Sequence, residues 1–220
     1  MTSPIFFPTV QDISPTPPVP APVLAPVNPR CSPTIGPCIA TVDQLYETVS
    51  GLSSGNTIAL CGVGDAFITS SVVTVEADST TLCCAGDSCV LQSSGDDRNL
   101  LVSGQSFTVR DITFLDGVSA SSGGNVAILA GGNHLIIDSS FRNGVSDERG
   151  GNLFIRTEGN VLIEGSKFID GTASTSGGGL ALDLPLSVEI LDTEFMGNIA
   201  VEGGGFFTTR GSPTAPGQTV

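Results

Sequence analysis

Residues 106–213 divide into four segments of 27 residues, SFTVRDITFLDGVSASSGGNVAILAGG, NHLIIDSSFRNGVSDERGGNLFIRTEG, NVLIEGSKFIDGTASTSGGGLALDLPL and SVEILDTEFMGNIAVEGGGFFTTRGSP. Each segment has a phenylalanine at the same place, followed after nine residues by a glycine pair. The phenylalanines are Phe114, Phe141, Phe168 and Phe195, and the pairs begin at Gly123, Gly150, Gly177 and Gly204. A fixed period of roughly 20 to 50 residues is typical of a solenoid.

Apolar residues alternate with period two within each segment, at Phe107 and Val109, and then change phase to Ile112 and Phe114. The change of phase predicts a bend between two strands. The residue at the bend is of a type that favours turns, namely Asp111, Asp138, Gly165 or Asp192. A third strand follows the glycine pair. We therefore predict an all-β fold, a single-stranded right-handed parallel β-helix with three short strands per coil of about 27 residues.

Stacking the coils about 4.8 Å apart turns every repeat position into a column. The four phenylalanines are then expected to form a ladder inside the solenoid. A small polar column of Ser139, Ser166 and Thr193 is expected to form hydrogen bonds along its axis.

Eleven of the fourteen prolines fall between Pro4 and Pro37, which favours an extended conformation that cannot build a core. We assign residues 1–37 to a Pro-rich disordered linker and residues 38–220 to the β-helix. The segment from Thr41 to Gly51 has a capping box at Thr41 and Gln44 and one apolar face. It predicts a short amphipathic helix that caps the first coil.

The other end of the solenoid carries no comparable cap in the sequence after Arg210. We expect the natural β-helix to be truncated here at its C-terminus and to continue with further coils. An uncovered end invites pairing with other chains, so we also expect end-to-end self-association.

Six cysteines lie within the first 89 residues, and none has the spacing of a metal-binding C-x-x-C motif. An even number indicates disulfides and an extracellular or cell-surface location. We expect Cys61 with Cys83, Cys84 with Cys89, and the remaining two together. The first 24 residues lack the features of a secretory signal peptide.

The net charge of −14 makes nucleic acid an unsuitable partner, because such binding needs cations that displace phosphate counterions. No segment has the roughly 18 apolar residues of a membrane span, so no transmembrane segment is predicted. An excess of carboxylates serves solubility or attracts Ca²⁺.

The segment from Phe195 to Asn198, with the glycines from Gly203 onward, resembles the Phe-x-x-Asn and Gly-Gly-Ala-Ile repeats of polymorphic outer-membrane proteins. The wider pattern is similar to secreted proteins of the pectin lyase-like superfamily. The first three coils depart from it, with Gly117, Gly144 and Gly171 where asparagine is usual. The resemblance implies the β-helix fold, and its members include adhesins, lyases and hydrolases.

The carbohydrate lyases of this fold imply an arginine or lysine base on an outward strand face, often with Ca²⁺. Here Arg156, Asp183 and Arg210 share one outward repeat position in successive segments. An exposed ion-pair ladder is the simpler interpretation. The functional alternative is a ligand-binding strip for sugar acids, because arginine pairs with carboxylates through two hydrogen bonds.

Asp116, Asn143 and Asp170 form a second column, each before a glycine. The turn chemistry of Asp-Gly and Asn-Gly explains them, and a Ca²⁺ site built from their oxygens is the alternative. The polygalacturonase-like hydrolases imply paired aspartates and a Gly-His-Gly motif. Asp96 and Asp97 lie outside the regular coils, and His134 reads as a strand residue, so we assign no catalytic residue.

The sequence thus predicts a secreted or cell-surface β-helix with an adhesive, structural or carbohydrate-binding role and no essential cofactor. The expected partners are polysaccharides or cell-surface components. The alternative is a polysaccharide lyase or glycoside hydrolase acting on acidic polysaccharide.

Overall fold

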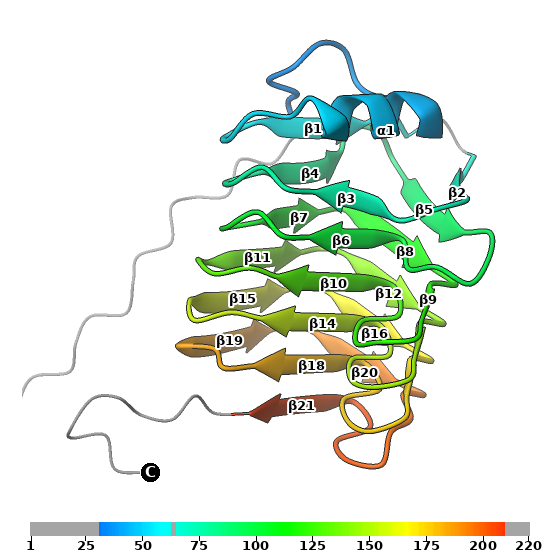
Figure 1. Cartoon of the computed structure of the whole chain (residues 1–220), viewed down its shortest axis with the longest axis vertical. Coiled ribbons are helices and arrows are strands. Elements are labelled where there is room, and N and C mark those ends of the chain that lie inside the picture. Colours follow the sequence, from blue (N-terminus) through cyan, green and yellow to red (C-terminus); the bar gives the residue numbers. More distant parts are fainter. Residues whose placement is uncertain (1–30, 63–64, 210–220) are drawn as a thin grey trace, which may run out of the picture.

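The computed structural model describes residues 31–62 and 65–209, and these form a parallel β-solenoid (Figure 1). Three sheets of six parallel strands run the length of the stack. We name them after their first strands. The β1 sheet contains β1 (Thr57–Leu60), β4 (Thr81–Cys84), β7 (Thr108–Arg110), β11 (His134–Ile137), β15 (Asn160–Glu164) and β19 (Ser187–Leu191).

The other two large sheets complete each coil. The β2 sheet contains β2 (Phe67–Thr69), β5 (Cys89–Ser93), β8 (Ile112–Leu115), β12 (Ser140–Arg142), β16 (Lys167–Ile169) and β20 (Glu194–Met196). The β3 sheet contains β3 (Val73–Val75), β6 (Leu100–Val102), β10 (Val126–Leu129), β14 (Leu153–Arg156), β18 (Leu180–Asp183) and β21 (Phe206–Thr209). A small sheet joins β9 (Val118–Ser119), β13 (Val145–Ser146) and β17 (Thr172–Ala173). The predicted fold class is confirmed.

The phenylalanine ladder lies inside the stack, as the period predicts. The rings of Phe114, Phe141 and Phe168 are fully buried, and successive ring centroids are 5.1 and 5.0 Å apart with nearly parallel planes. Phe195 continues the stack at 5.0 Å. The column of small hydroxyl side chains links neighbouring coils as well, because the backbone N–H of Ser139 donates to Ser166 Oγ at 3.2 Å.

The predicted bends are left-handed turns. Asp111, Asp138 and Asp192 have φ angles of 57°, 47° and 46°, and Gly165 has 60° in the same column. Aspartate, asparagine and glycine tolerate this conformation better than other residues do. The strands on either side of the bend can therefore change direction without strain in every coil.

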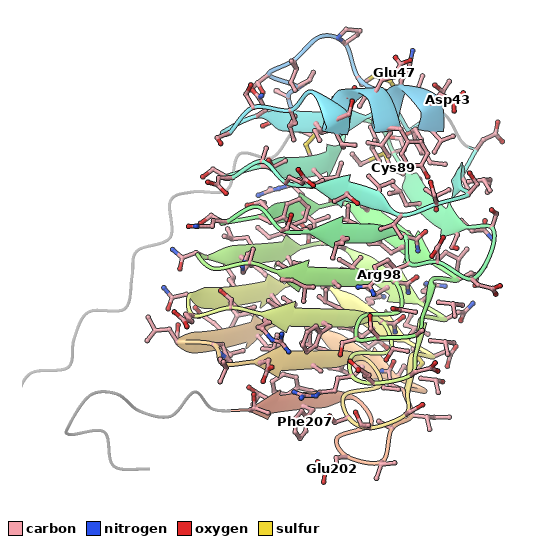
Figure 2. The ribbon with its side chains drawn as sticks, in the orientation of Figure 1. Asp43, Glu47, Cys89, Arg98, Glu202 and Phe207 are labelled. Atoms are coloured by element: carbon pink, nitrogen blue, oxygen red, sulfur yellow. A yellow bond between two sulfur atoms is a disulfide. The ribbon has the colours of Figure 1, made fainter. Side chains whose placement is uncertain are left out.

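The helix α1 (Val42–Ser50) lies across one end of the stack (Figure 1). The Thr41 hydroxyl accepts from the Gln44 backbone N–H at 3.3 Å, and the Gln44 side chain accepts from the Ala40 N–H at 3.0 Å. Leu45 is fully buried, and Tyr46 packs against the same core. The predicted cap is present, and Figure 2 shows Asp43 and Glu47 on the side of the helix away from the strands.

The last coil is one residue shorter than the predicted 27. Thr172 still faces Ile199, but Ser176 faces Glu202, so the missing residue falls in the loop between them. The left-handed glycine of this coil is Gly203 instead of Gly204. As a consequence the register places Thr209 beside Asp183. The alignment of Arg210 with Asp183 is therefore wrong, and Arg210 itself lies outside the described residues.

The disulfides connect Cys31 with Cys83, Cys38 with Cys61, and Cys84 with Cys89. The last pairing was predicted, and the other two predicted pairings are wrong. The reason is the register of the first coils: Ala59, not Cys61, lies beside Cys83. Cys31 and Thr34 thus hold the start of the described chain against the first coils, with the Thr57 N–H donating to Thr34 Oγ1 at 2.7 Å. The part of the predicted linker at residues 1–30 lies outside the described residues.

Candidate ligand-binding face

The strands of the β3 sheet alternate between the interior and the outer surface, which gives the outer surface two columns. The first is formed by Ala127, Phe154, Ala181 and Phe207, and the second by Leu129, Arg156, Asp183 and Thr209. The loops that hold the repeated glycines pass beside the first column, and both Phe154 and Ala181 are buried although they point outward. These loops therefore form a wall along the sheet.

A groove of about 630 Å³ lies between this wall and the sheet. Its apolar lining comes from Val72, Leu101, Val118, Leu129 and Phe154. Its polar lining comes from Thr74, Asp96, Asp97, Arg98, Ser119, Ser121, Ser122, Glu148 and Arg156. An apolar surface with a limited set of polar groups is the usual composition of a ligand site.

Asp183 brings together Arg149 and Arg156, of which Arg156 lines the groove. Its carboxylate accepts from Arg156 Nε at 3.1 Å, lies 3.4 Å from Arg149 Nη1, and accepts from the Thr209 hydroxyl. The Arg156 guanidinium also lies over the Phe154 ring, 5.6 Å from its centroid. The predicted strip thus contains an ion pair between Arg156 and Asp183, as the simpler interpretation required.

The charge state of Asp183 reflects these contacts. Burial alone would raise the pKa of its carboxyl group, but the hydrogen bonds from Thr209 and Arg156 and the charges of Arg149 and Arg156 outweigh it. The pKa is lowered, so the carboxylate stays ionised over a wider range of pH. It can therefore hold both guanidinium groups in mildly acidic solution.

Arg98 fixes the serine-rich wall on the other side of the groove. Its Nη2 donates to Ser119 Oγ and Ser121 Oγ at 2.6 Å each, and its Nη1 donates to the Ser122 carbonyl at 3.1 Å. Burial lowers the pKa of Arg98, against the opposing charge of Asp97. Figure 2 shows Arg98 beside the loops that connect to β9. Its donors are used to hold the wall in place.

The predicted metal column lies at the second bend of each coil, and none of its three residues lines the groove. Asp116, Asn143 and Asp170 all have left-handed φ angles, of 57°, 54° and 51°. Asp116 accepts from Asn143 Nδ2 and Gln92 Nε2, each at 2.9 Å. These contacts fit the turn interpretation. Among residues 31–62 and 65–209, no three His, Cys, Asp or Glu side chains are grouped as a metal site.

Sequence reasoning missed most of the groove. Glu148, which lines the groove, and Arg149, which pairs with Asp183, lie in the polar loop before a glycine pair, where the repeat pattern gives no sign of a site. Asp96 and Asp97 precede the regular coils, so the repeat does not predict their neighbours. The structure brings them to the same groove as Arg156.

His134 is confirmed as a strand residue. It is fully buried in β11 and does not line the groove.

Two properties bear on location. All six cysteines are paired, which is compatible with an extracellular protein. The one helix among the described residues is too short to cross a bilayer.

Comparison with known proteins adds no family to these observations. No protein-family model, no curated protein and no solved structure matches this chain.

Proposed function

We propose that this β-helix is secreted or exposed at a cell surface and binds carboxylated polysaccharide without cleaving it. The observation that carries the proposal is the convergence of Arg149 and Arg156 on the single carboxylate of Asp183. Two guanidinium groups thus meet at one carboxylate on a chain whose net charge is −14. Arginine binds carboxylates strongly, often through two parallel hydrogen bonds.

The exposure of the two arginines supports this proposal. The side chain of Arg156 is 56% exposed and that of Arg149 is 35% exposed, whereas Asp183 is only 13% exposed. The buried carboxylate of Asp183 thus fixes the positions of the two arginine side chains, while part of each guanidinium group stays accessible to a ligand. Arginine has five N–H donors, and Arg156 uses Nε for Asp183.

The groove beside Arg156 also offers contacts to the ring of a sugar acid. Leu101 and Leu129 offer apolar area to the C–H faces of sugar rings, and Ser121 and Ser122 offer hydroxyl groups. A ligand would thus present its carboxylate to Arg156 and its ring to the floor of the groove.

Isothermal titration of the full chain with a short oligogalacturonate, and with a neutral oligosaccharide of equal length, tests the proposal. We expect binding of the charged ligand only. Arg156→Leu, which introduces the residue found one coil earlier at Leu129, should weaken binding by about 10- to 100-fold, as expected for a hydrogen bond between charged groups. Arg142→Leu removes the same charge from the β2 sheet, and we expect no loss. Equal binding of the neutral ligand, or equal losses in both variants, would contradict the proposal.

A second candidate, an enzyme acting on acidic polysaccharide, is favoured by one observation. Carboxylates from two loops, Asp96 and Asp97 from one and Glu148 from the other, line the groove that holds Arg156. Glycoside hydrolases use two carboxylates on either side of the scissile bond. Release of unsaturated or reducing ends from pectate or alginate, abolished in Asp97→Asn and Glu148→Gln, would replace the binding proposal with this one.

The calcium column stays a prediction. If Asp116, Asn143 and Asp170 bind Ca²⁺, then millimolar Ca²⁺ should raise the melting temperature of the protein, because a ligand that binds only the folded state stabilises it. Asp116→Asn should abolish that increase. An unchanged melting temperature would leave the three residues with their turn role alone.

A further inference from the structure

The single histidine of the chain lies inside the solenoid. His134 is fully buried at the start of β11, in an interior column that continues to Val161 in β15 and Val188 in β19. Phe107 precedes it in this column at the same repeat position and is also buried. A titratable ring therefore stands where the neighbouring coils have apolar side chains.

Both ring nitrogens of His134 are engaged. Nδ1 accepts from the backbone N–H of Phe107 at 3.1 Å, which requires that Nδ1 carries no proton. Nε2 lies 3.0 Å from the Ala130 carbonyl oxygen, to which it donates in this tautomer. The ring is thus held in the neutral state by a donor on one side and an acceptor on the other.

No charge on the adjoining strands offsets protonation. Arg110 lies at the end of β7 and Glu164 at the end of β15, both on the outward side of the β1 sheet, since the inward positions are Val109 and Ile163. Burial lowers the pKa of His134, and the hydrogen bond to the Ala130 carbonyl raises it by a smaller amount.

We propose that His134 is an acid-sensitive switch that opens the solenoid between β7 and β11. A proton on Nδ1 replaces the acceptor of the Phe107 N–H with a second donor, so this hydrogen bond breaks and a positive charge is left in an apolar interior. The buried polar residues described in the other coils are serine, threonine and asparagine, which carry no charge. These coils therefore have no comparable response to acid.

The position of His134 matters because the coils before and after the contact between β7 and β11 differ in their disulfide crosslinks. All three disulfides lie at or before Cys89, on the β7 side. The groove draws residues from both sides, with Asp97 and Leu101 before the step and Phe154 and Arg156 after it. Opening the step separates the groove residues of one coil from those of the next while the crosslinked coils stay closed.

The sign of the pH dependence follows from linkage. Because folding lowers the pKa of His134 below its ordinary value of about 6.5, the contribution of His134 to stability is fully present above about pH 6.5 and is lost as the pH falls toward the folded pKa. Over that window the equilibrium constant for unfolding should rise by up to about tenfold per pH unit relative to a variant without the histidine.

Two measurements test this proposal. With one histidine in the chain, the imidazole NMR signals of the native protein report its titration without ambiguity, and we expect no protonation of the folded state near pH 6.5. Urea unfolding of the wild type, His134→Val and His134→Phe between about pH 5 and pH 8 should show the extra acid destabilisation in the wild type alone. The variants repeat the residues found at Val161 and Phe107.

Hydrogen exchange locates the opening. At about pH 5, after correction for intrinsic rates, protection of the amides in β7 and β11 should fall in the wild type and persist in the variants. An imidazole that titrates at its ordinary pKa in the folded protein would overturn the proposal. Identical pH profiles of wild type and variants would overturn it as well, and so would loss of protection confined to other coils.

Discussion

Phe141 stands in the middle of the interior ladder and has a parallel ring on each side, at 5.1 and 5.0 Å. Replacing it with alanine should lower the free energy of unfolding by about 3–5 kcal/mol, because the hydrogen-bonded strands prevent the neighbouring coils from closing the gap. Chemical unfolding measures the loss. Arg142→Ala, at the exposed next position, is the control and should change stability by less than about 0.5 kcal/mol. A loss below about 1 kcal/mol for Phe141→Ala would contradict a close-packed ladder.

Gly151 lies where the loop of one coil touches the next. A Cβ atom at this position would clash with the Gly178 carbonyl oxygen and with the backbone of Thr172. Gly151→Ala should therefore cost at least about 1–3 kcal/mol, as overpacking does. Gly131 has no atom within 4 Å of such a Cβ, so Gly131→Ala is the control and should be tolerated. Thermal unfolding of both variants checks this, and equal melting temperatures would show that the loops are not stacked so closely.

Phe141 and Gly151 show which structural features can be predicted from a sequence repeat. Phe141 could be predicted because an apolar residue at a fixed period has only the interior in which to stack. The glycine pairs were also visible as a pattern, but their cause was not. Gly150 needs both a left-handed φ of 65° and the absence of a Cβ atom, whereas Gly151 needs the absence of a Cβ atom alone. A sequence records the residue type and leaves those two reasons indistinguishable.

At the scale of elements, a ladder of buried asparagines ties the loops to the β3 sheet. Asn99 Nδ2 donates to Asn125 Oδ1 at 2.9 Å, and Asn125 Nδ2 donates to Asn152 Oδ1 at 2.8 Å. Asn152 Oδ1 also accepts from the backbone N–H of Gly144, eight residues earlier, at 2.9 Å. The next member by repeat position is Gly179, which has no amide.

Asn198 takes the place of the missing amide. Its Oδ1 accepts from Asn152 Nδ2 at 3.3 Å and from the backbone N–H of Gly171 at 2.9 Å, the two bonds expected of an asparagine at position 179. A Cβ atom at Gly179 would lie 3.0 Å from Asn198 Cγ. The asparagine of one coil thus fills the space that the glycine of the preceding coil leaves.

A double-mutant cycle tests this exchange. Asn198→Gly should cost about 1–3 kcal/mol, because it leaves the Gly171 N–H without its partner and leaves Asn152 Nδ2 with the Ile169 carbonyl as its one remaining acceptor. Gly179→Asn alone should also destabilise the protein through the clash with Asn198. The double variant should be more stable than the sum of the two losses predicts, by about 0.5–3 kcal/mol, as measured by urea unfolding. Additive losses would contradict the replacement.

The replacement of an asparagine at position 179 by Asn198 also explains why the last coil has a different residue from the first three coils at this repeat position. Asparagine follows the phenylalanine by three residues only in the last coil, where Asn198 stands in the column of Gly117, Gly144 and Gly171. The departure could be seen in the repeat alignment. Its meaning could not, because positions 179 and 198 are neighbours only after the coils have stacked.

For the molecule as a whole, the disulfides concentrate in the first coils and leave the rest to packing. Mass spectrometry of the unreduced protein should find no free thiol and should recover peptides joined through Cys31 and Cys83 and through Cys38 and Cys61. Reductant should then expose residues 31–105 to protease before residues 106–209. Free thiols, or peptides joining Cys61 to Cys83, would contradict the structure.

The two wrong disulfide predictions have the same cause. Pairing Cys61 with Cys83 requires neighbouring coils to be offset by 22 residues, whereas the strands pair at an offset of 24, from Thr57 to Thr81. Where the period is regular, from Ser106 onward, the same procedure predicted neighbours correctly through three coils. The prediction of neighbours was wrong again in the last coil, which is one residue shorter than the others. Register can therefore be predicted only as far as the period stays constant.

The end of the described stack opposite α1 differs from the helix-covered end. Among the described residues, the strands β19, β20 and β21 pair on one side only. Interior side chains of this coil, among them Ile190 and Phe206, pack against the core but are only partly buried. Strand edges and half-covered apolar rings together favour association with another chain.

We therefore predict that the chain associates end to end in solution. Sedimentation velocity at several concentrations should show a weight-average mass that rises with concentration, and Phe206→Glu should lower that mass by placing a charge in the joint. Val145→Glu, on the exposed side of β13 in the middle of the small sheet, introduces the same charge away from the strand edges and should leave the mass unchanged. A monomer at every concentration would contradict the prediction, because it would mean that the partly buried interior of this coil needs no partner.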